Sequence, residues 1–150
     1  MLTTIEHSDD ILQVKVPLPF PLRWVNSYLV RGSAGWTLID PGLRTPEAEA
    51  LWHAVLQERG IAFEHIEQVV LTHHHPDHYG LAGWFQERTG APVLLSETGW
   101  RQVQLMWQGS CRCPGCSWIC SLATGCRPAS WKRWSGTWQA SCRLCPRSRR

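Results

Sequence analysis

Acidic residues, histidine and cysteine are each missing from one part of this 150-residue chain. No acidic residue follows Glu97, no histidine follows His78 and no cysteine precedes Cys111. Residues 1–97 hold 6 basic and 12 acidic side chains, a net charge of −6, whereas residues 98–150 hold 9 basic and no acidic ones, a net charge of +9. The overall charge of +3 therefore describes neither part, and each part has to be interpreted separately.

Long apolar segments are also missing. The chain has no run of roughly 18 or more apolar residues, so the sequence predicts no transmembrane helix. The first ten residues are acidic and contain no apolar core segment, so we expect no secretory signal there. We therefore expect a cytoplasmic protein that makes no contact with a membrane.

The first part of the chain alternates between strand and helix patterns. Short strands are expected over residues 11–16, 25–31, 36–40, 66–71 and 93–95. A helix is expected to begin after the N-cap Thr45 and to stop at Gly60, and two more are expected over residues 81–88 and 97–107. This order of strands and helices is typical of an α/β fold in which helices cover a sheet.

Four side chains that can bind a metal follow directly after the apolar strand at residues 66–71: His73, His75, Asp77 and His78. His73 and His75 are two residues apart in an extended segment, so they can point toward one centre, and imidazole nitrogens suit zinc. Asp77 and His78 follow the turn imposed by Pro76 and can serve a second ion. The alternative is a polar loop without function, in which His74 in particular points away.

The segment Thr72-His73-His74-His75-Pro76-Asp77-His78 resembles the His-x-His-x-Asp-His signature of the metallo-β-lactamase superfamily. The upstream segments at residues 25–30 and 38–42 resemble the hairpin that precedes this signature in the family, and Gly80 lies where the family's next helix begins. The resemblance covers about residues 10–107. It is specific for the superfamily and for no substrate within it.

This resemblance implies an α/β fold, half of an αββα sandwich, and a metal-dependent hydrolase of ester, thioester, lactam or phosphodiester substrates. His73 and His75 resemble ligands of a first ion, and Asp77 and His78 resemble ligands of a second, with Asp77 also the candidate catalytic residue. Asp40 resembles the aspartate that braces the site. Two Zn²⁺ ions are expected, with iron or manganese as alternatives, and such ions lower the pKa of bound water to about 7.

The family completes its site with downstream residues that this chain lacks. A further histidine for each ion and a bridging acid are expected there, but no histidine follows His78 and no acid follows Glu97. Neither ion then has the three protein ligands typical of catalytic zinc, so we expect impaired activity or a non-catalytic metal-binding remnant. Half a sandwich also leaves an apolar sheet face uncovered, through which two copies of the chain could associate as a homodimer.

The sequence thus predicts a partial domain over residues 1–108 and an irregular, disordered tail rich in Cys, Trp and Arg over residues 109–150. The tail contains no Val, Phe, Tyr, Asp, Glu or His, a composition typical of out-of-frame translation of a GC-rich gene. The favoured hypothesis is a frameshift near residues 108–110. A second is a zinc knuckle formed by Cys113, Cys116, Cys142 and Cys145, although its 25 intervening residues exceed the usual roughly 15–20. Unpatterned positive charge only weakly favours a third, nucleic-acid binding.

Overall fold

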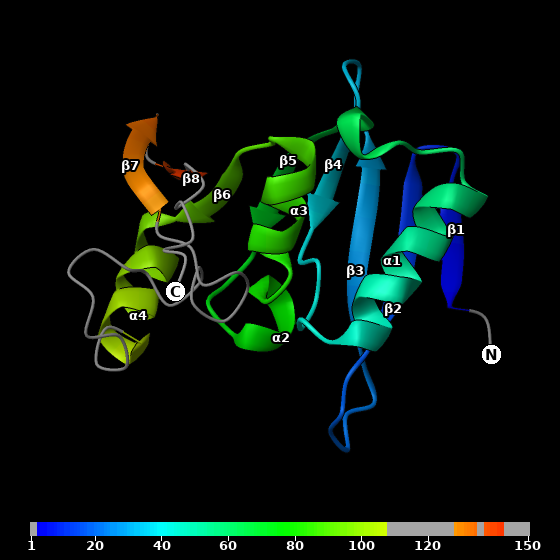
Figure 1. Ribbon diagram of the computed structural model, residues 1–150, viewed down its shortest axis with the longest axis horizontal. Helices are drawn as coiled ribbons and strands as arrows, with labels where there is room; N and C mark the ends of the chain where they lie inside the picture. The colour runs from blue at the N-terminus through cyan, green and yellow to red at the C-terminus, as the bar shows by residue number, and fades with distance from the viewer. Residues whose placement is uncertain (1–2, 108–127, 135–136, 143–150) are drawn as a thin grey trace, which may run out of the picture.

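The computed structural model describes residues 3–107, 128–134 and 137–142. These residues form one mixed sheet with helices packed against it (Figure 1). The strands are β1 (Thr4–Ser8), β2 (Ile11–Pro17), β3 (Trp24–Arg31), β4 (Trp36–Ile39), β5 (Ile66–Leu71), β6 (Val93–Ser96), β7 (Pro128–Trp134) and β8 (Thr137–Cys142). The helices are α1 (Pro46–Glu58), the 3₁₀ turn η1 (Phe63–His65), α2 (Pro76–Tyr79), α3 (Ala82–Thr89) and α4 (Glu97–Trp107).

The strand order in the sheet is β1-β2-β3-β4-β5-β6-β8-β7. Strands β1 to β4 pair antiparallel, and β4, β5 and β6 pair parallel through the helical crossovers. The apolar segment expected to be an interior strand is β5, which is paired on both sides. Because β4 and β5 are parallel neighbours, the loops that follow them meet at one edge of the sheet.

Helix α1 confirms the expected capping pattern and fixes the loop after β4. The hydroxyl of Thr45 accepts a hydrogen bond from the backbone N–H of Ala48 at 3.1 Å, and Gly60 takes the left-handed conformation at φ +63°. The buried face of the helix includes Trp52, whose Nε1–H donates to the carbonyl of Pro41 at 2.8 Å. Packing of α1 therefore positions the segment that leaves the end of β4.

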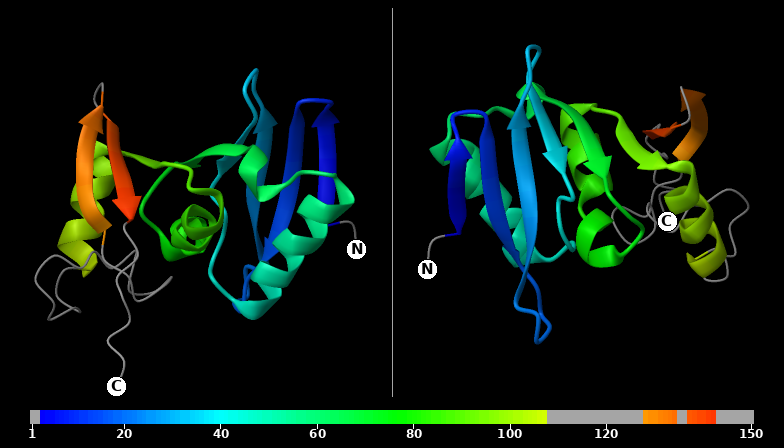
Figure 2. Two further views of the ribbon diagram at one scale, coloured as in Figure 1. Left: turned by 45° about the horizontal axis from the view of Figure 1, so that its top comes forward. Right: turned by 180° about the vertical axis from the view of Figure 1, so that it is seen from behind.

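The two faces of the sheet differ in cover. Helices α1 and α3 lie on one face, and the view from behind shows β1 to β4 with none of the described helices in front of them (Figure 2). A row of cross-strand partners, Tyr28, Ile39, Val70 and Leu94, lies only half-buried on that side, whereas their immediate neighbours in the chain, such as Leu29 and Val69, are buried. The fold is thus a mixed α/β sheet with helices, and association of two copies through the open face stays a prediction.

Two segments of the expected tail are described by the structure, and both are short strands. Residues 128–134 and 137–142 form the hairpin of β7 and β8, and β8 pairs antiparallel with β6. The physical reason is the open edge of β6, whose backbone groups accept a further strand whatever its side-chain pattern. The predicted disorder of residues 109–127, 135–136 and 143–150 lies outside the described residues.

Strand β1 and the short helix α2 were also missed by the sequence patterns, because five and four residues carry too little periodicity to predict. Among the helices of the described residues, none has the length and apolar character that crossing a bilayer requires.

We predict that Gly42→Ala destabilises the fold more than Gly60→Ala does. A Cβ at Gly42, with φ at +102°, would lie 2.6 Å from Cγ1 of Val16, whereas a Cβ at Gly60 meets nothing within 4 Å. Gly60→Ala should lower the free energy of unfolding by about 1–2 kcal/mol from backbone strain alone. Gly42→Ala should lower the free energy of unfolding by about 1–3 kcal/mol more than Gly60→Ala does, because the added methyl group overpacks against Val16. Urea unfolding of both variants measures the difference, and equal losses would contradict it.

Candidate metal centre

The candidate site lies where the loops after β4 and β5 meet. Asp40 directly follows β4, His73 lies two residues beyond β5, and His78 lies on α2. Backbone hydrogen bonds hold the two loops together: Gly42 N–H donates to the carbonyl of His78 at 3.1 Å, and Leu81 N–H donates to the carbonyl of Gly42 at 2.9 Å. These hydrogen bonds therefore fix the backbone from which the side chains of the site project.

The carboxylate of Asp40 is the central acceptor of this site. Asp40 is 4% exposed, and its backbone has a positive φ of 49°, which is uncommon for a residue other than glycine. Its Oδ1 accepts the backbone N–H of Thr72 at 2.8 Å, and its Oδ2 accepts the Thr72 hydroxyl at 2.5 Å and Nδ1–H of His78 at 2.9 Å. The buried hydroxyl of Ser27 donates to the carbonyl of Asp40. Both carboxylate oxygens are thus occupied by donors from the protein.

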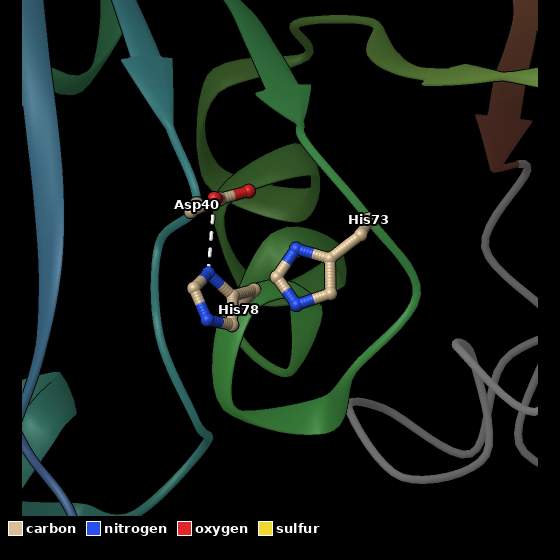
Figure 3. Close-up of side chains that lie close together, drawn as sticks. All are labelled: Asp40, His73 and His78. Carbon is tan, nitrogen blue, oxygen red and sulfur yellow. Dashed lines mark hydrogen bonds and ion pairs between the residues drawn. The ribbon is translucent and has the colours of Figure 1, made fainter. Parts of the chain in front are cut away.

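The bond to Asp40 fixes the imidazole of His78. Because Nδ1–H donates to the carboxylate, Nε2 of the neutral His78 imidazole carries the lone pair and is the nitrogen available to a metal (Figure 3). This Nε2 lies 3.6 Å from Oδ2 of Asp77. A histidine held by a carboxylate through one nitrogen while the other faces a metal is a recurrent arrangement in metal sites.

The ring of His73 lies beside that of His78, with 4.1 Å between their centroids. The hydroxyl of Thr72 has one proton, which goes to Asp40, so at 2.9 Å it accepts a hydrogen bond from Nδ1–H of His73. Nε2 of His73 is then also free for a metal. The ring of His75 lies 4.7 Å from that of His73, and the ring of His74 lies 6.3 Å from it.

Electrostatics shift three pKa values in this cluster. Burial raises the pKa of Asp40, but the hydrogen bonds from His78 and Thr72 outweigh burial and bring it below its usual value. The hydrogen bond to Asp40 raises the pKa of His78. Burial and the neighbouring histidines lower the pKa of His73, which keeps its imidazole neutral and able to bind a metal at neutral pH.

One ligand atom each from Asp40, His73 and His78 lie within 4.8 Å of one another. Of these three groups, the two imidazoles each keep a nitrogen for a metal, whereas the carboxylate of Asp40 is occupied by Thr72 and His78. Of the four predicted ligands, the structure brings His73 and His78 into this group with Asp40, whereas His75 and Asp77 lie outside it. The ring of His75 contacts that of His73, and Oδ2 of Asp77 lies 3.6 Å from Nε2 of His78. The assignment of each pair to its own ion stays a prediction.

Sequence reasoning missed Thr72, whose backbone and hydroxyl satisfy both oxygens of Asp40. Its position directly after the buried strand β5 was the available signal, since a residue there faces the loop after β4. A hydroxyl at that point gives no metal-ligand pattern, so the sequence alone did not single it out.

The chain matches the family model of the Metallo-beta-lactamase superfamily over residues 22–103, which include every residue of the site described above. This match covers more than half of the chain. The protein belongs to the metallo-β-lactamase superfamily, and its His/Asp cluster supplies part of a possible metal site.

Two curated proteins resemble the chain in sequence. The probable metallo-hydrolase YqjP of Bacillus subtilis (strain 168) is 44% identical over 80 residues, which are 53% of this chain and 25% of that protein. Hydroxyacylglutathione hydrolase of Albidiferax ferrireducens is 31% identical over 103 residues, covering 61% of this chain and 36% of that protein. The chain thus spans between a quarter and about a third of the length of these relatives.

Two solved structures also resemble the chain. A metallo-beta-lactamase family protein from Thermus thermophilus is 40% identical with a TM-score of 0.56, over 60% of this chain and 30% of that one. A beta-lactamase domain protein from Burkholderia ambifaria is 30% identical with a TM-score of 0.61, over 69% of this chain and 33% of that one. The mixed sheet with its helices is therefore part of the metallo-β-lactamase fold.

The bond between Asp40 and His78 predicts a defined pH dependence for stability without metal. The raised pKa of His78 gives a contribution that is complete below its unfolded value of 6.5 and is lost as pH rises through the folded pKa. The lowered pKa of Asp40 gives a contribution present above 3.8 and lost as pH falls through the folded pKa. The pair should therefore stabilise the fold most between about pH 3.8 and 6.5.

This dependence is measured as the difference in unfolding free energy between the wild type and Asp40→Asn in a chelator-containing buffer. Both proteins keep the burial that lowers the pKa of His73, so most of the opposite dependence of His73 is common to them. The difference should be larger near pH 5.5 than near pH 9. A difference that is flat, or that grows toward alkaline pH, would contradict the ion pair.

Proposed function

We propose that this chain carries part of the dinuclear metal site of a metal-dependent hydrolase. In this proposal His73 and His75 bind a first ion, Asp77 and His78 bind a second, and Asp40 orients His78. The observation that carries it is the 2.9 Å hydrogen bond from Nδ1 of His78 to Asp40, which leaves Nε2 for a metal. Zinc is the proposed metal because imidazole and carboxylate are ligands that it accepts.

The residues of the site fit this role chemically. When bound, divalent metal ions lower the pKa of water and stabilise negative charge that develops on a substrate oxygen. Asp40 holds His78 in one tautomer and orientation, and the lowered pKa of His73 keeps that imidazole deprotonated. Asp77, with its carboxylate 3.6 Å from Nε2 of His78, supplies the negative charge on this side of the cluster.

The substrate is proposed only as a class: a small molecule with a hydrolysable ester, thioester, lactam or phosphodiester bond. Relatives named metallo-hydrolase, hydroxyacylglutathione hydrolase and metallo-beta-lactamase support hydrolysis without choosing among these bonds. We propose that residues 1–150 by themselves turn substrate over slowly, since residues 79–150 contain no histidine and residues 98–150 contain no acidic residue to add to the ligand sets.

The competing proposal is a non-catalytic protein that binds metal through this cluster or through the cysteine knuckle. Of the four knuckle cysteines, Cys113, Cys116 and Cys145 lie outside the described residues, and Cys142 ends β8. The described residues therefore leave the knuckle untested, whereas they bring His73 and His78 together. The metal-binding experiment below separates the two.

Metal binding should depend on His73 and His78 and much less on His74. We expect His73→Ala and His78→Ala to weaken Co²⁺ or Zn²⁺ binding at least tenfold, since each removes a ligand. Asp40→Asn should weaken it by about 10–100-fold because His78 loses its orienting partner. His74→Ala is the matched control from the same loop and should bind like the wild type.

Calorimetric titration measures these affinities, and the Co²⁺ absorption spectrum identifies the ligands. Histidine and carboxylate ligands produce no thiolate-to-metal charge-transfer band, whereas the cysteine knuckle would. A strong charge-transfer band that persists in His73→Ala would contradict the proposed site and favour the knuckle.

Hydrolysis should be slow and sensitive to chelators. With p-nitrophenyl acetate and bis-p-nitrophenyl phosphate as generic substrates, we expect turnover that is removed by EDTA and restored by Zn²⁺. It should be lost in His73→Ala and retained in His74→Ala. If the wild-type protein binds metal through the histidines but shows no chelator-sensitive turnover, the hydrolase proposal is contradicted and the non-catalytic alternative is supported.

A further inference from the structure

A continuous chain of hydrogen bonds joins the two neighbouring imidazoles of the candidate site. Nδ1–H of His78 donates to Oδ2 of Asp40 at 2.9 Å, and the hydroxyl of Thr72 donates to the same oxygen at 2.5 Å. Because this hydroxyl has only one proton, its oxygen accepts Nδ1–H of His73 at 2.9 Å. One carboxylate oxygen is therefore linked directly to His78 and, through a hydroxyl group, to His73.

The carboxylate of Asp40 fixes the direction of this chain of hydrogen bonds. An ionised carboxylate has only acceptors, so the proton between Oδ2 and the hydroxyl of Thr72 belongs to the hydroxyl. The hydroxyl oxygen then offers only lone pairs to His73, and the proton between them belongs to Nδ1 of the imidazole. In the neutral ring of His73 the lone pair is therefore on Nε2.

We propose that Thr72 is a positioning residue through which Asp40 sets the tautomer and orientation of His73. This inference rests on the proposed metal site, in which His73 binds an ion through Nε2. Removal of the partner that orients a metal-binding histidine typically weakens metal binding by about 10–100-fold. Thr72 is exposed, so water competes with its hydroxyl, and we expect an effect of about tenfold, at the lower end of this range.

The substitution Asp40→Asn should reverse the direction of the chain of hydrogen bonds. The backbone N–H of Thr72 donates to Oδ1 of Asp40 at 2.8 Å and can only donate, so the amide oxygen of the asparagine stays at this place. Its NH₂ group then replaces Oδ2 and donates to the hydroxyl oxygen of Thr72, whose own proton turns to Nδ1 of His73. The proton of the His73 ring moves to Nε2, the nitrogen that the metal needs.

The test is a long-range ¹H–¹⁵N NMR spectrum of the histidine rings of the full chain in EDTA, at a pH high enough that the rings are neutral. The ¹⁵N shift distinguishes a protonated from an unprotonated ring nitrogen, and His73→Ala identifies the signals of His73. We expect the Nδ1–H tautomer of His73 in the wild type and in Thr72→Ser, which restores the hydroxyl. Thr72→Val should leave both tautomers populated, and Asp40→Asn should give the Nε2–H tautomer.

Zinc affinity, measured by calorimetric titration, should follow the tautomer. Thr72→Val should bind Zn²⁺ about tenfold more weakly than the wild type, whereas Thr72→Ser should bind it with nearly the wild-type affinity. Thr37→Val is the matched control, because the hydroxyl of Thr37 also accepts a hydrogen bond, from Nε2 of Gln68 at 3.0 Å, but that bond joins β4 to β5 outside the site. It should change neither the tautomer of His73 nor the affinity for Zn²⁺.

The double variant Asp40→Asn with Thr72→Val tests whether Asp40 acts on His73 through the hydroxyl. In this background Asp40→Asn should still change the tautomer of His78, which it contacts directly, but should leave that of His73 as it is in Thr72→Val alone. An effect on His73 that persists without the hydroxyl would overturn the proposal.

Three further results would overturn the proposal: an Nε2–H tautomer of His73 in the wild type, an unchanged Nδ1–H tautomer in a folded Thr72→Val variant, or wild-type Zn²⁺ affinity in that variant. Failure of the proposed function is a different result. A wild type that shows the expected tautomers but binds no metal would contradict the metal site, while the tautomers would still support the role of Thr72.

Discussion

The carboxylate of Asp40 is the interaction on which the candidate site depends. It joins the end of β4 to two parts of the chain that lie more than thirty residues further on: the first residue after β5 and helix α2. Its oxygens accept hydrogen bonds from the backbone and hydroxyl of Thr72 and from one nitrogen of His78. A single buried carboxylate therefore holds the loop after β5 in place and orients the imidazole of His78. The left-handed backbone of Asp40 is strained, and the network of hydrogen bonds around the residue maintains it.

The surrounding fold explains why this carboxylate is held so firmly. The parallel pairing of β4 and β5 brings their ends to one edge, Trp52 of α1 fixes the carbonyl of Pro41, and Gly42 permits contact with Val16 that a larger residue would block. Since interiors are close-packed, displacement of any of these contacts shifts the loop that carries Asp40. The geometry of the candidate metal site therefore depends on contacts on the covered face of the sheet.

The sequence predicts much of this arrangement and leaves out the parts that depend on tertiary contacts. The interior strand β5, the cap at Thr45 and the stop at Gly60 carry strong local signals, and the histidine motif directly after β5 indicates metal binding by spacing alone. The partners of Asp40 carry no such signal, because Thr72 and His78 meet it only after β4 and β5 pair. The sequences of β7 and β8 lack the alternating pattern that predicts a strand, and β8 joins the sheet by pairing with the open edge of β6.

The most direct test of the account is a crystal structure of the zinc-loaded protein with anomalous scattering measured at the zinc edge. The account predicts anomalous peaks at the histidine motif, with Nε2 of His73 and of His78 each about 2.0–2.1 Å from a zinc ion and Nδ1 of His78 still bonded to Asp40. A zinc ion bound instead through Nδ1 of His78, with the bond to Asp40 broken, or peaks found only among the cysteines, would contradict it.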